Sequence, residues 1–338
     1  PPGARFIRLR HVPLLKYKEI FIFVRLMSMD TTLLALRAVA ESTRLRLLAL
    51  LSGGEVSVGE LVIVLRQSQP RVSRHLKLLV EAEVVERFRD RHHVYYRLTR
   101  MPELRSFVDQ VLASLKNDSE IATDRLRLDE IKFGREKIAY AQIGEAQSWA
   151  DTFRQRPDES DIHDAFDDAL SGTELGDLLD VRTGTGALLG YLAPHASSAT
   201  GVDRSDATRL LARSRLQQAG LADCTLRNVE GKCLPFAESS FDTVLLNEAM
   251  SHATDQMSAL GEAVRVLRRN GQLLILDWIA PVSLQNRGGR ELSENQVRAL
   301  LAEHGLEIVQ RAWLPGKSPD YALFKAVPAK AQRTGTMH

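Results

Sequence analysis

The sequence predicts an α/β protein in two parts, an N-terminal winged helix-turn-helix followed by a Rossmann-like, mainly parallel open sheet. Two stretches carry this prediction. Residues 57–79 (SVGELVIVLRQSQPRVSRHLKLL) have the spacing of a DNA-reading helix pair, and residues 177–203 (DLLDVRTGTGALLGYLAPHASSATGVD) suit a strand, a glycine-containing turn, a helix and a second strand. A length of 338 residues also favours two domains over one.

The charge pattern points to a local basic surface. The net charge is only +2, so attraction of nucleic acid must come from a patch. Residues 66–100 supply one, with nine Lys and Arg against four acids. The two cysteines, Cys224 and Cys233, are too few for a disulfide scaffold and suggest a cytoplasmic protein. No apolar run is long enough to predict a membrane span.

The chain is expected to fall into five segments. The first 28 residues lack continuity with the helix that follows, which suggests a non-native or disordered leader ahead of Met29, or alternatively a short membrane-surface anchor. The expected segments are a leader at 1–28, the winged helix-turn-helix at 29–100, dimerisation and linker helices at 101–139, a nucleotide-binding domain at 140–327 and a disordered tail at 328–338.

The first domain is expected to begin with two helices. Apolar residues recur at helical intervals over 30–51 and are interrupted near 41–43, so Ser42 or Thr43 is expected to cap a second helix beginning at Arg44. The Ser-Gly-Gly run that follows ends this helix, because glycine accepts the left-handed conformation at a helix C-terminus.

Two shorter helices are expected next. Ser57 caps a helix through Leu65, and Glu60 completes a capping box. Ser68 caps the recognition helix, which runs to about Leu79 and carries a proline in its first turn, where a missing N–H does no harm.

A β-ribbon and a long helix complete the first half. Residues 84–98 alternate and are rich in Val, Phe and Tyr, which predicts two strands joined by a charged turn at 89–92. Residues 102–127 have a helical period, and we expect one long helix that pairs with its copy in a homodimer. Residues 130–170 are expected to form helices that connect the domains and cover a ligand.

Strand-like runs alternate with helical patterns in the second half. The strand candidates are LLDV, ATGVD, FDTVLLN and GQLLILD, which is the order of an open, mainly parallel sheet. Residues 306–309 and 321–325 are expected to pair as antiparallel strands.

The recognition helix is predicted to present a polar, basic face to the major groove. Val72, Leu76 and Leu79 point inward, which leaves the basic side chains near the helix N-terminus exposed. The residues predicted to contact double-stranded operator DNA from this helix and the wing are Ser68, Gln69, Arg71, Ser73, Arg74, His75, Lys77, Arg89, Arg91 and His92.

This half resembles the ArsR/SmtB family over AESTRLRLLALLSGGEVSVGELVIVLRQSQPRVSRHLKLLVEAEVVERFRDRHHVYYRL, with SQPRVSRHLKLL as the most specific part. The resemblance implies a dimeric repressor that reads imperfect palindromes and releases DNA when an effector binds. Residues 1–223 contain no cysteine, which excludes soft-metal sensing at the helix before the recognition helix. His92 and His93 are adjacent in a strand and point to opposite faces, so no metal site is predicted.

The turn after the first strand of the second half is suited to a nucleotide. Its glycines let the backbone approach a ligand, and Asp203, 19 residues after Gly184, is placed to accept hydrogen bonds from ribose hydroxyls. A GxG alone leaves two classes open, because folds that bind NAD and folds that bind S-adenosylmethionine both use it.

The motifs DVRTGTG, GVDRS, EGKCLPF, FDTVLLNEAMSH and RVLRRNGQLLILD resemble class I S-adenosylmethionine-dependent methyltransferases that act on small molecules. The resemblance implies S-adenosylmethionine or S-adenosylhomocysteine as ligand, with His252 as the weak catalytic candidate and Trp149 in a segment that closes the pocket. The residues it implies for binding are Asp180, Arg182, Gly184, Gly186, Asp203, Arg204, Glu230, Gly231 and Asn247.

Three departures from that pattern bear on activity. Arg182 replaces the first glycine of the loop, and its cation would block the pocket or repel a sulfonium, unless the side chain turns to solvent. Asn270 stands where Pro-Gly is usual, and the stretch after residue 281 is short for an acceptor site.

These observations lead to a ligand-responsive DNA-binding regulator whose methyltransferase-like domain senses S-adenosylhomocysteine or S-adenosylmethionine. Two alternatives stay open. The first is an active small-molecule methyltransferase with an autoregulatory DNA-binding domain. The second is a constitutive repressor whose second half is a degenerate dimerisation scaffold.

Overall fold

The computed structural model describes residues 28–91, 93–145, 156–229, 233–253, 255–279, 292–314 and 321–329. The chain divides into two compact units, Pro1–Ser52 with Val56–Leu128, and Gly53–Glu55 with Asp129–His338. Nearly all of the predicted leader and tail lies outside the described residues.

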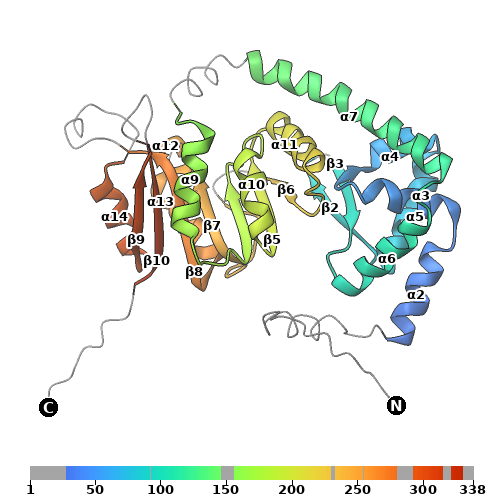
Figure 1. Cartoon of the computed structure of the whole chain (residues 1–338), viewed down its shortest axis with the longest axis horizontal. Coiled ribbons are helices and arrows are strands. Elements are labelled where there is room, and N and C mark those ends of the chain that lie inside the picture. The colour runs from blue at the N-terminus through green and yellow to red at the C-terminus, as the bar shows by residue number, and fades with distance from the viewer. Residues whose placement is uncertain are drawn as a thin grey trace, which may run out of the picture. The chain divides into compact units, whose positions relative to one another are not determined.

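The first unit is a winged helix-turn-helix (Figure 1). Its core holds Leu47, Leu61, Val72 and Leu76, which are all fully buried. A three-stranded antiparallel sheet in the order β1-β3-β2 forms the wing. The elements are α2 (Met29–Val39), α3 (Ser42–Leu51), β1 (Val56–Ser57), α4 (Val58–Leu65), α5 (Gln69–Glu81), β2 (Val85–Asp90), β3 (His93–Leu98) and α6 (Pro102–Ser114).

The residues at which the helices begin can be compared with the predicted caps. The capping box of Ser57 and Glu60 is confirmed. The prediction for α3 is wrong: the helix begins at Ser42, and the cap is Glu41, whose carboxylate accepts a hydrogen bond from the Arg44 amide at 2.9 Å. A carboxylate there also interacts favourably with the helix dipole, which a hydroxyl does less well.

The single helix predicted over 102–127 is also wrong. The structure has α6 and then α7 (Ser119–Glu145), separated by a short turn. Asp118 begins the second helix by accepting hydrogen bonds from the amides of Glu120 and Ile121 at 3.0 and 2.9 Å. The apolar period continues across the turn, so it does not reveal the break. Helix α7 begins in the first unit and continues into the second.

The second unit is a seven-stranded sheet in the order β6-β5-β4-β7-β8-β10-β9. The five neighbouring strands β6, β5, β4, β7 and β8 are parallel to one another. Strand β10 runs antiparallel to both β8 and β9. The predicted strands are confirmed, and β6 is one that the sequence analysis missed. The strands are β4 (Asp177–Val181), β5 (Ser198–Asp203), β6 (Thr225–Asn228), β7 (Phe241–Asn247), β8 (Leu267–Trp278), β9 (Leu306–Trp313) and β10 (Tyr321–Pro328).

Helices cover both faces of this sheet, which explains its continuously apolar central strands. Phe166, Leu189 and Ala212 belong to the apolar cluster on one face, and Leu260 and Leu301 belong to the cluster on the other. The first set comes from α9 (Glu159–Leu170), α10 (Ala187–Leu192) and α11 (Asp206–Gln218), and the second from α13 (Gln256–Val266) and α14 (Glu294–Glu303).

The strand order reverses beside β4, since β5 lies on one side of it and β7 on the other. Ligands of open α/β sheets bind outside the carboxyl ends of the strands at such a reversal. The short helix α12 (Ala249–His252) follows β7 at this edge.

Candidate functional site

A cavity of about 430 Å³ lies where β4, β5 and β7 end. Four of the predicted ligand residues line it, namely Arg182, Gly184, Asp203 and Asn247. Several other lining residues were not predicted, and they come from helices, from the segment just before α9 and from the end of β7. These include Tyr140, Arg156, Glu159, His163, Arg215 and Glu248.

The loop after β4 depends on left-handed backbone. Gly186 has a φ of +76°, and a Cβ there would stand 3.0 Å from the Cβ of Ala212. Gly184 has a φ of +55° but an open Cβ position, so there its backbone, rather than packing, favours glycine. Arg182 also has a left-handed φ, +65°, a backbone conformation that favours glycine.

The Arg182 side chain turns into the site instead of out to solvent. It is partly buried, lines the cavity and donates a hydrogen bond to the main-chain carbonyl oxygen of Glu248. The part of the chain that the structure describes offers it no carboxylate as an ion-pair partner.

Asp203 is held by its own loop and by the loop after β4. One carboxylate oxygen accepts a hydrogen bond from the Gly184 amide at 3.0 Å, and the other accepts from Ser205 N and Thr208 Oγ1 at 2.9 and 3.0 Å. The carboxylate is thereby oriented at the cavity wall. Its neighbour Arg204 is exposed and does not line the cavity.

Asp180 is fully buried at the end of β4. Among the described residues, neither of its carboxylate oxygens has a hydrogen-bond partner. Burial raises the pKa of Asp180 to about 7, and the negative charge of Asp203 adds to this shift, whereas Thr183 and Arg156 oppose it. The side chains of Thr183 and Asn247 are its polar neighbours, and both favour its charged form.

A second polar cluster closes the β7 side of the cavity. Arg156 Nε lies 2.9 Å from a Glu248 carboxylate oxygen, and its Nη2 donates to Asn247 Oδ1 at 3.1 Å. The Tyr321 hydroxyl donates to the same Glu248 oxygen at 2.9 Å, and burial raises the pKa of Tyr321. No sequence motif marks Arg156 or Tyr321, because only the fold brings them to the end of β7.

Several predicted site residues lie outside what the structure describes. Glu230, Gly231, Trp149 and His92 are not among the described residues, and neither is the side chain of His252. Gly186 supports the loop by packing, without lining the cavity.

The recognition helix α5 buries the predicted apolar side, since Val72, Leu76 and Leu79 are fully buried. His75 is partly buried, and its Nδ1 lies 3.4 Å from a carboxylate oxygen of Glu41. Ser73 is partly buried. The exposed predicted residues are Ser68, Gln69, Arg71, Arg74, Lys77, Arg89 and Arg91.

Comparison with known proteins identifies the first unit. Residues 41–87 match the bacterial regulatory protein family arsR. The chain is also 39% identical over 98 residues to the arsenic resistance transcriptional regulator ArsR1 of Pseudomonas putida, covering 28% of this chain and 75% of that regulator. The chain belongs to the arsR family. Its arsR-type DNA-binding domain is fused to a second domain of a different family.

That second domain matches the methyltransferase family over residues 179–275. The chain is 30% identical over 104 residues to the uncharacterized methyltransferase YcgJ of Bacillus subtilis, and 30% identical over 115 residues to the ubiquinone/menaquinone C-methyltransferase UbiE of Geobacter sulfurreducens. These matches cover 31% and 33% of this chain, but only 41% and 45% of those enzymes. This arsR-family chain therefore spans less than half the length of the curated methyltransferases that it matches.

Solved methyltransferase structures are also similar to the arsR-family chain. An S-adenosylmethionine-dependent methyltransferase from Clostridium acetobutylicum superposes with a TM-score of 0.48 at 14% identity, covering 56% of this chain and all of that one. The N-methyltransferase NodS of Bradyrhizobium japonicum, solved with S-adenosyl-L-homocysteine, gives 0.44 at 21% identity over 51% and 88% of the two chains.

Two further findings concern the described ranges alone. None of their helices is both long and apolar enough to cross a membrane. They also contain no group of three or more His, Cys, Asp or Glu side chains able to hold a metal ion.

Proposed function

We propose that this protein is a transcriptional regulator that binds operator DNA as a homodimer and responds to S-adenosylhomocysteine or S-adenosylmethionine bound in its methyltransferase domain. The arsR-family domain supports the DNA-binding part, with Arg71 and Arg74 exposed at the start of α5. Such a regulator would act in the cytoplasm, where its operator lies.

The observation that carries the regulatory part is the course of helix α7. Its first turns belong to the DNA-binding unit, where Asp124 forms an ion pair with Arg46 of α3. Its later turns belong to the methyltransferase unit, where Tyr140 lines the cavity and Glu136 accepts a hydrogen bond from Ser214 of α11. One helix therefore carries contacts of both units, and a ligand that moves Tyr140 would act on the helix that also holds Asp124.

The residues of the cavity fit an adenosyl ligand with an amino-acid tail. Asp203 is oriented by its loop to accept hydrogen bonds from ribose hydroxyls. Asp180 is fully buried beside Thr183 and does not itself line the cavity, and its carboxyl would offer the ligand's α-ammonium group a partner. A volume of about 430 Å³ lies within the usual range for small-ligand pockets.

The homodimer is proposed because two half-sites of an operator need two recognition helices related by a two-fold axis. Helix α2 offers an apolar stripe for such an interface, with Met29, Leu33 and Leu36 exposed at helical spacing. Light scattering on the full chain would measure the oligomeric state directly.

The deciding experiment measures operator affinity with and without ligand. A fluorescent duplex, selected by the protein from a random library, is titrated by anisotropy in buffer, in saturating S-adenosylhomocysteine and in saturating S-adenosylmethionine. We expect at least one ligand to change the Kd by about tenfold, which corresponds to a coupling free energy of about 1.4 kcal/mol. An unchanged Kd, with ligand binding shown by calorimetry, would refute the regulatory function.

Methyl transfer to a small acceptor is the second candidate function, because the cavity stays open beside Arg182. Alignment of donor and acceptor supplies most of what such a reaction needs. Release of S-adenosylhomocysteine from S-adenosylmethionine, stimulated by an acceptor library, would favour it. Turnover that Arg182→Gly does not change would mean that the arginine is harmless to the enzyme.

A further inference from the structure

The arginines that line the cavity differ in how far the protein engages them. Arg156 is paired with the carboxylate of Glu248 at 2.9 Å, and Arg215 is exposed on α11, where it donates to Thr185 Oγ1 at 3.3 Å. Arg182 is partly buried, and in the described part of the chain only its Nη1 has a partner, the carbonyl oxygen of Glu248. Its Nε and Nη2 are therefore hydrogen-bond donors available to a molecule in the cavity.

The position of Arg182, and not the net charge of the cavity, distinguishes it. Glu159, Asp203 and Glu248 also line the cavity and balance its arginines in charge. Arg182 directly follows β4, and its hydrogen bond reaches Glu248, which directly follows the neighbouring strand β7. Asp203 ends β5, on the other side of β4. A ligand whose ribose is held by Asp203 would extend its tail across the end of β4 toward Arg182, over two strand spacings or about 10 Å.

The backbone of these two loops is strained. Arg182 has a φ of +65° and Glu248 has a φ of +52°, in the left-handed region that costs free energy for residues other than glycine. Strained backbone of this kind clusters at sites that hold a ligand. A ligand contact therefore explains an arginine at this position better than the stability of the loop does.

We infer that Arg182 binds the α-carboxylate of the ligand's amino-acid tail, so that the cavity selects adenosyl amino acids over adenosine derivatives that lack a carboxylate. The inference rests on the proposed function, since it assumes that an adenosyl ligand occupies the cavity. It adds which residue recognises the tail, and it does not depend on whether the sulfur of the ligand is methylated.

A guanidinium suits a carboxylate because two parallel N–H donors match its two oxygens. Nε and Nη2 lie on one edge of the planar group, so both can donate to one carboxylate while Nη1 keeps its bond to Glu248. That bond also orients the guanidinium before a ligand binds, which lowers the entropy lost on binding. The partly buried setting strengthens such a pair relative to one at the exposed surface.

The test is a double-mutant cycle between protein and ligand, measured by calorimetric titration of the full chain. The ligand is changed from S-adenosylhomocysteine to its α-carboxamide, which has nearly the same shape without the negative charge. The protein is changed by Arg182→Gln. A third ligand, 5′-methylthioadenosine, has no carboxylate and reports whether the adenosine part of the cavity is intact in each variant.

Three further variants complete the comparison. Arg182→Lys keeps a cation at the same position. Arg215→Gln removes the exposed arginine at the cavity rim, which is the rival partner for a carboxylate. Arg298→Gln removes an arginine of α14 that pairs with Glu294 and does not line the cavity, and it serves as the control.

For the unmodified chain we expect S-adenosylhomocysteine to bind at least about tenfold more tightly than its carboxamide. The ratio should fall to about twofold in Arg182→Gln, return in part in Arg182→Lys, and persist in Arg215→Gln and Arg298→Gln. The Kd of 5′-methylthioadenosine should be the same in Arg182→Gln as in the unmodified chain.

A ratio that survives unchanged in Arg182→Gln, or that falls in Arg215→Gln instead, would overturn the inference while leaving the proposed ligand class intact. An equal loss of 5′-methylthioadenosine and S-adenosylhomocysteine in Arg182→Gln would also overturn it, because the arginine would then support the pocket as a whole. Failure of S-adenosylhomocysteine and S-adenosylmethionine to bind the unmodified chain would instead remove the proposed function itself.

Discussion

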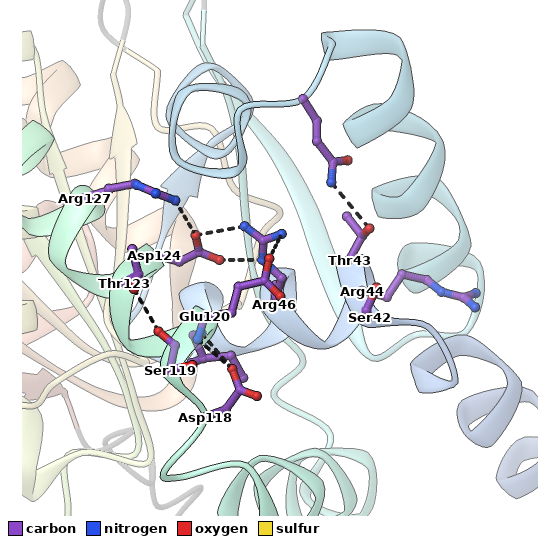
Figure 2. A network of polar contacts seen from close by, with 12 residues as sticks. Ser42, Thr43, Arg44, Arg46, Asp118, Ser119, Glu120, Thr123, Asp124 and Arg127 are labelled. Atoms are coloured by element: carbon purple, nitrogen blue, oxygen red, sulfur yellow. Dashed lines mark hydrogen bonds and ion pairs between the residues drawn. The ribbon is translucent and has the colours of Figure 1, made fainter.

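The guanidinium of Arg46 and the carboxylate of Asp124 form a two-point ion pair, with Nε to Oδ2 at 2.6 Å and Nη2 to Oδ1 at 2.9 Å (Figure 2). Asp124 is 1% exposed and also accepts a hydrogen bond from Arg127, while Arg46 contacts Glu120 at 2.8 Å. The pair fastens the first turns of α7 to α3, and α3 in turn contacts the recognition helix α5.

Loss of one partner of this buried pair should destabilise the attachment of α7 to α3. Asp124→Ala leaves Arg46 charged, 13% exposed and without its main partner, which costs about 3–5 kcal/mol for buried pairs. Hydrogen exchange of the full chain, followed by mass spectrometry, should show faster exchange in peptides of α3 and the start of α7.

The matched control is Asp109→Ala, which breaks the exposed pair of Arg105 and Asp109 on α6. Exposed pairs contribute about 0–1 kcal/mol, so exchange should change little. Equal effects of the two variants would mean that burial does not strengthen the pair of Arg46 and Asp124.

Helix α7 offers a direct test of coupling between ligand and DNA. Gly134 lies between Asp124 and Tyr140, and a Cβ at this position would meet nothing within 4 Å. Gly134→Pro should interrupt the helix, at a cost of about 3 kcal/mol or more, and reduce the effect of ligand on operator affinity to below about twofold. Gly134→Ala adds helix propensity without a new contact and should preserve that effect.

The measurement is operator anisotropy with and without ligand, alongside calorimetry to confirm that each variant still binds the ligand. Coupling that persists in Gly134→Pro, with helix α7 shown by circular dichroism to be interrupted, would mean that the signal travels by another route.

Two arginines of the recognition helix should dominate operator affinity. Arg71 and Arg74 are exposed at the start of α5, and loss of a base or phosphate contact costs about 1–3 kcal/mol. Arg71→Ala and Arg74→Ala should each weaken binding about tenfold or more by anisotropy. Arg125→Ala, which removes an exposed arginine of α7, is the control, and an equal loss there would point to a nonspecific effect of net charge.

The buried Asp180 should make the stability of the methyltransferase domain fall as pH rises. Its folded-state pKa of about 7 lies above the usual value of 3.8, so the native state binds more protons than the unfolded state between these values. Asp180→Asn should match the wild type near pH 4 and exceed its unfolding free energy by up to about 4 kcal/mol above pH 7. All three tryptophans lie in residues 129–338, so urea unfolding followed by their fluorescence reports this domain.

Asp242→Asn should change the unfolding free energy in the opposite direction to Asp180→Asn. Burial acts to raise the pKa of Asp242, but its hydrogen bond and ion pair with Arg268 outweigh this and lower the pKa. That variant should therefore be less stable than the wild type from pH 8 down to about pH 4, with a difference that shrinks only as the pH falls below the usual value of 3.8. A difference for Asp180→Asn that is constant with pH would show that the carboxyl does not titrate in this range.

Local signals in the sequence were sufficient to predict those elements whose stabilising contacts join residues close together in the chain. The capping box of Ser57 and Glu60 joins residues three apart, and the buried side of α5 follows from the period of Val72, Leu76 and Leu79. The alternation of 84–98 predicted the wing, although in β3 the four consecutive residues 95–98 are all buried. By contrast, the strand β1 has only two residues, too few for an alternation to appear.

By itself the sequence determined the two fold classes, the order of the domains and the recognition helix. It also determined that Gly184 lies in the turn after the strand β4 and that Asp203 ends the strand β5. These follow from periodicity and from turn chemistry, which act over a few residues. Tertiary structure alone decided that Arg156 and Tyr321 meet Glu248, that Arg182 faces the cavity without an acidic partner among the described residues, and that Asp124 reaches Arg46. Such contacts join positions as many as 165 residues apart, as in Arg156 with Tyr321, and only the packing of the sheet and its helices brings them together.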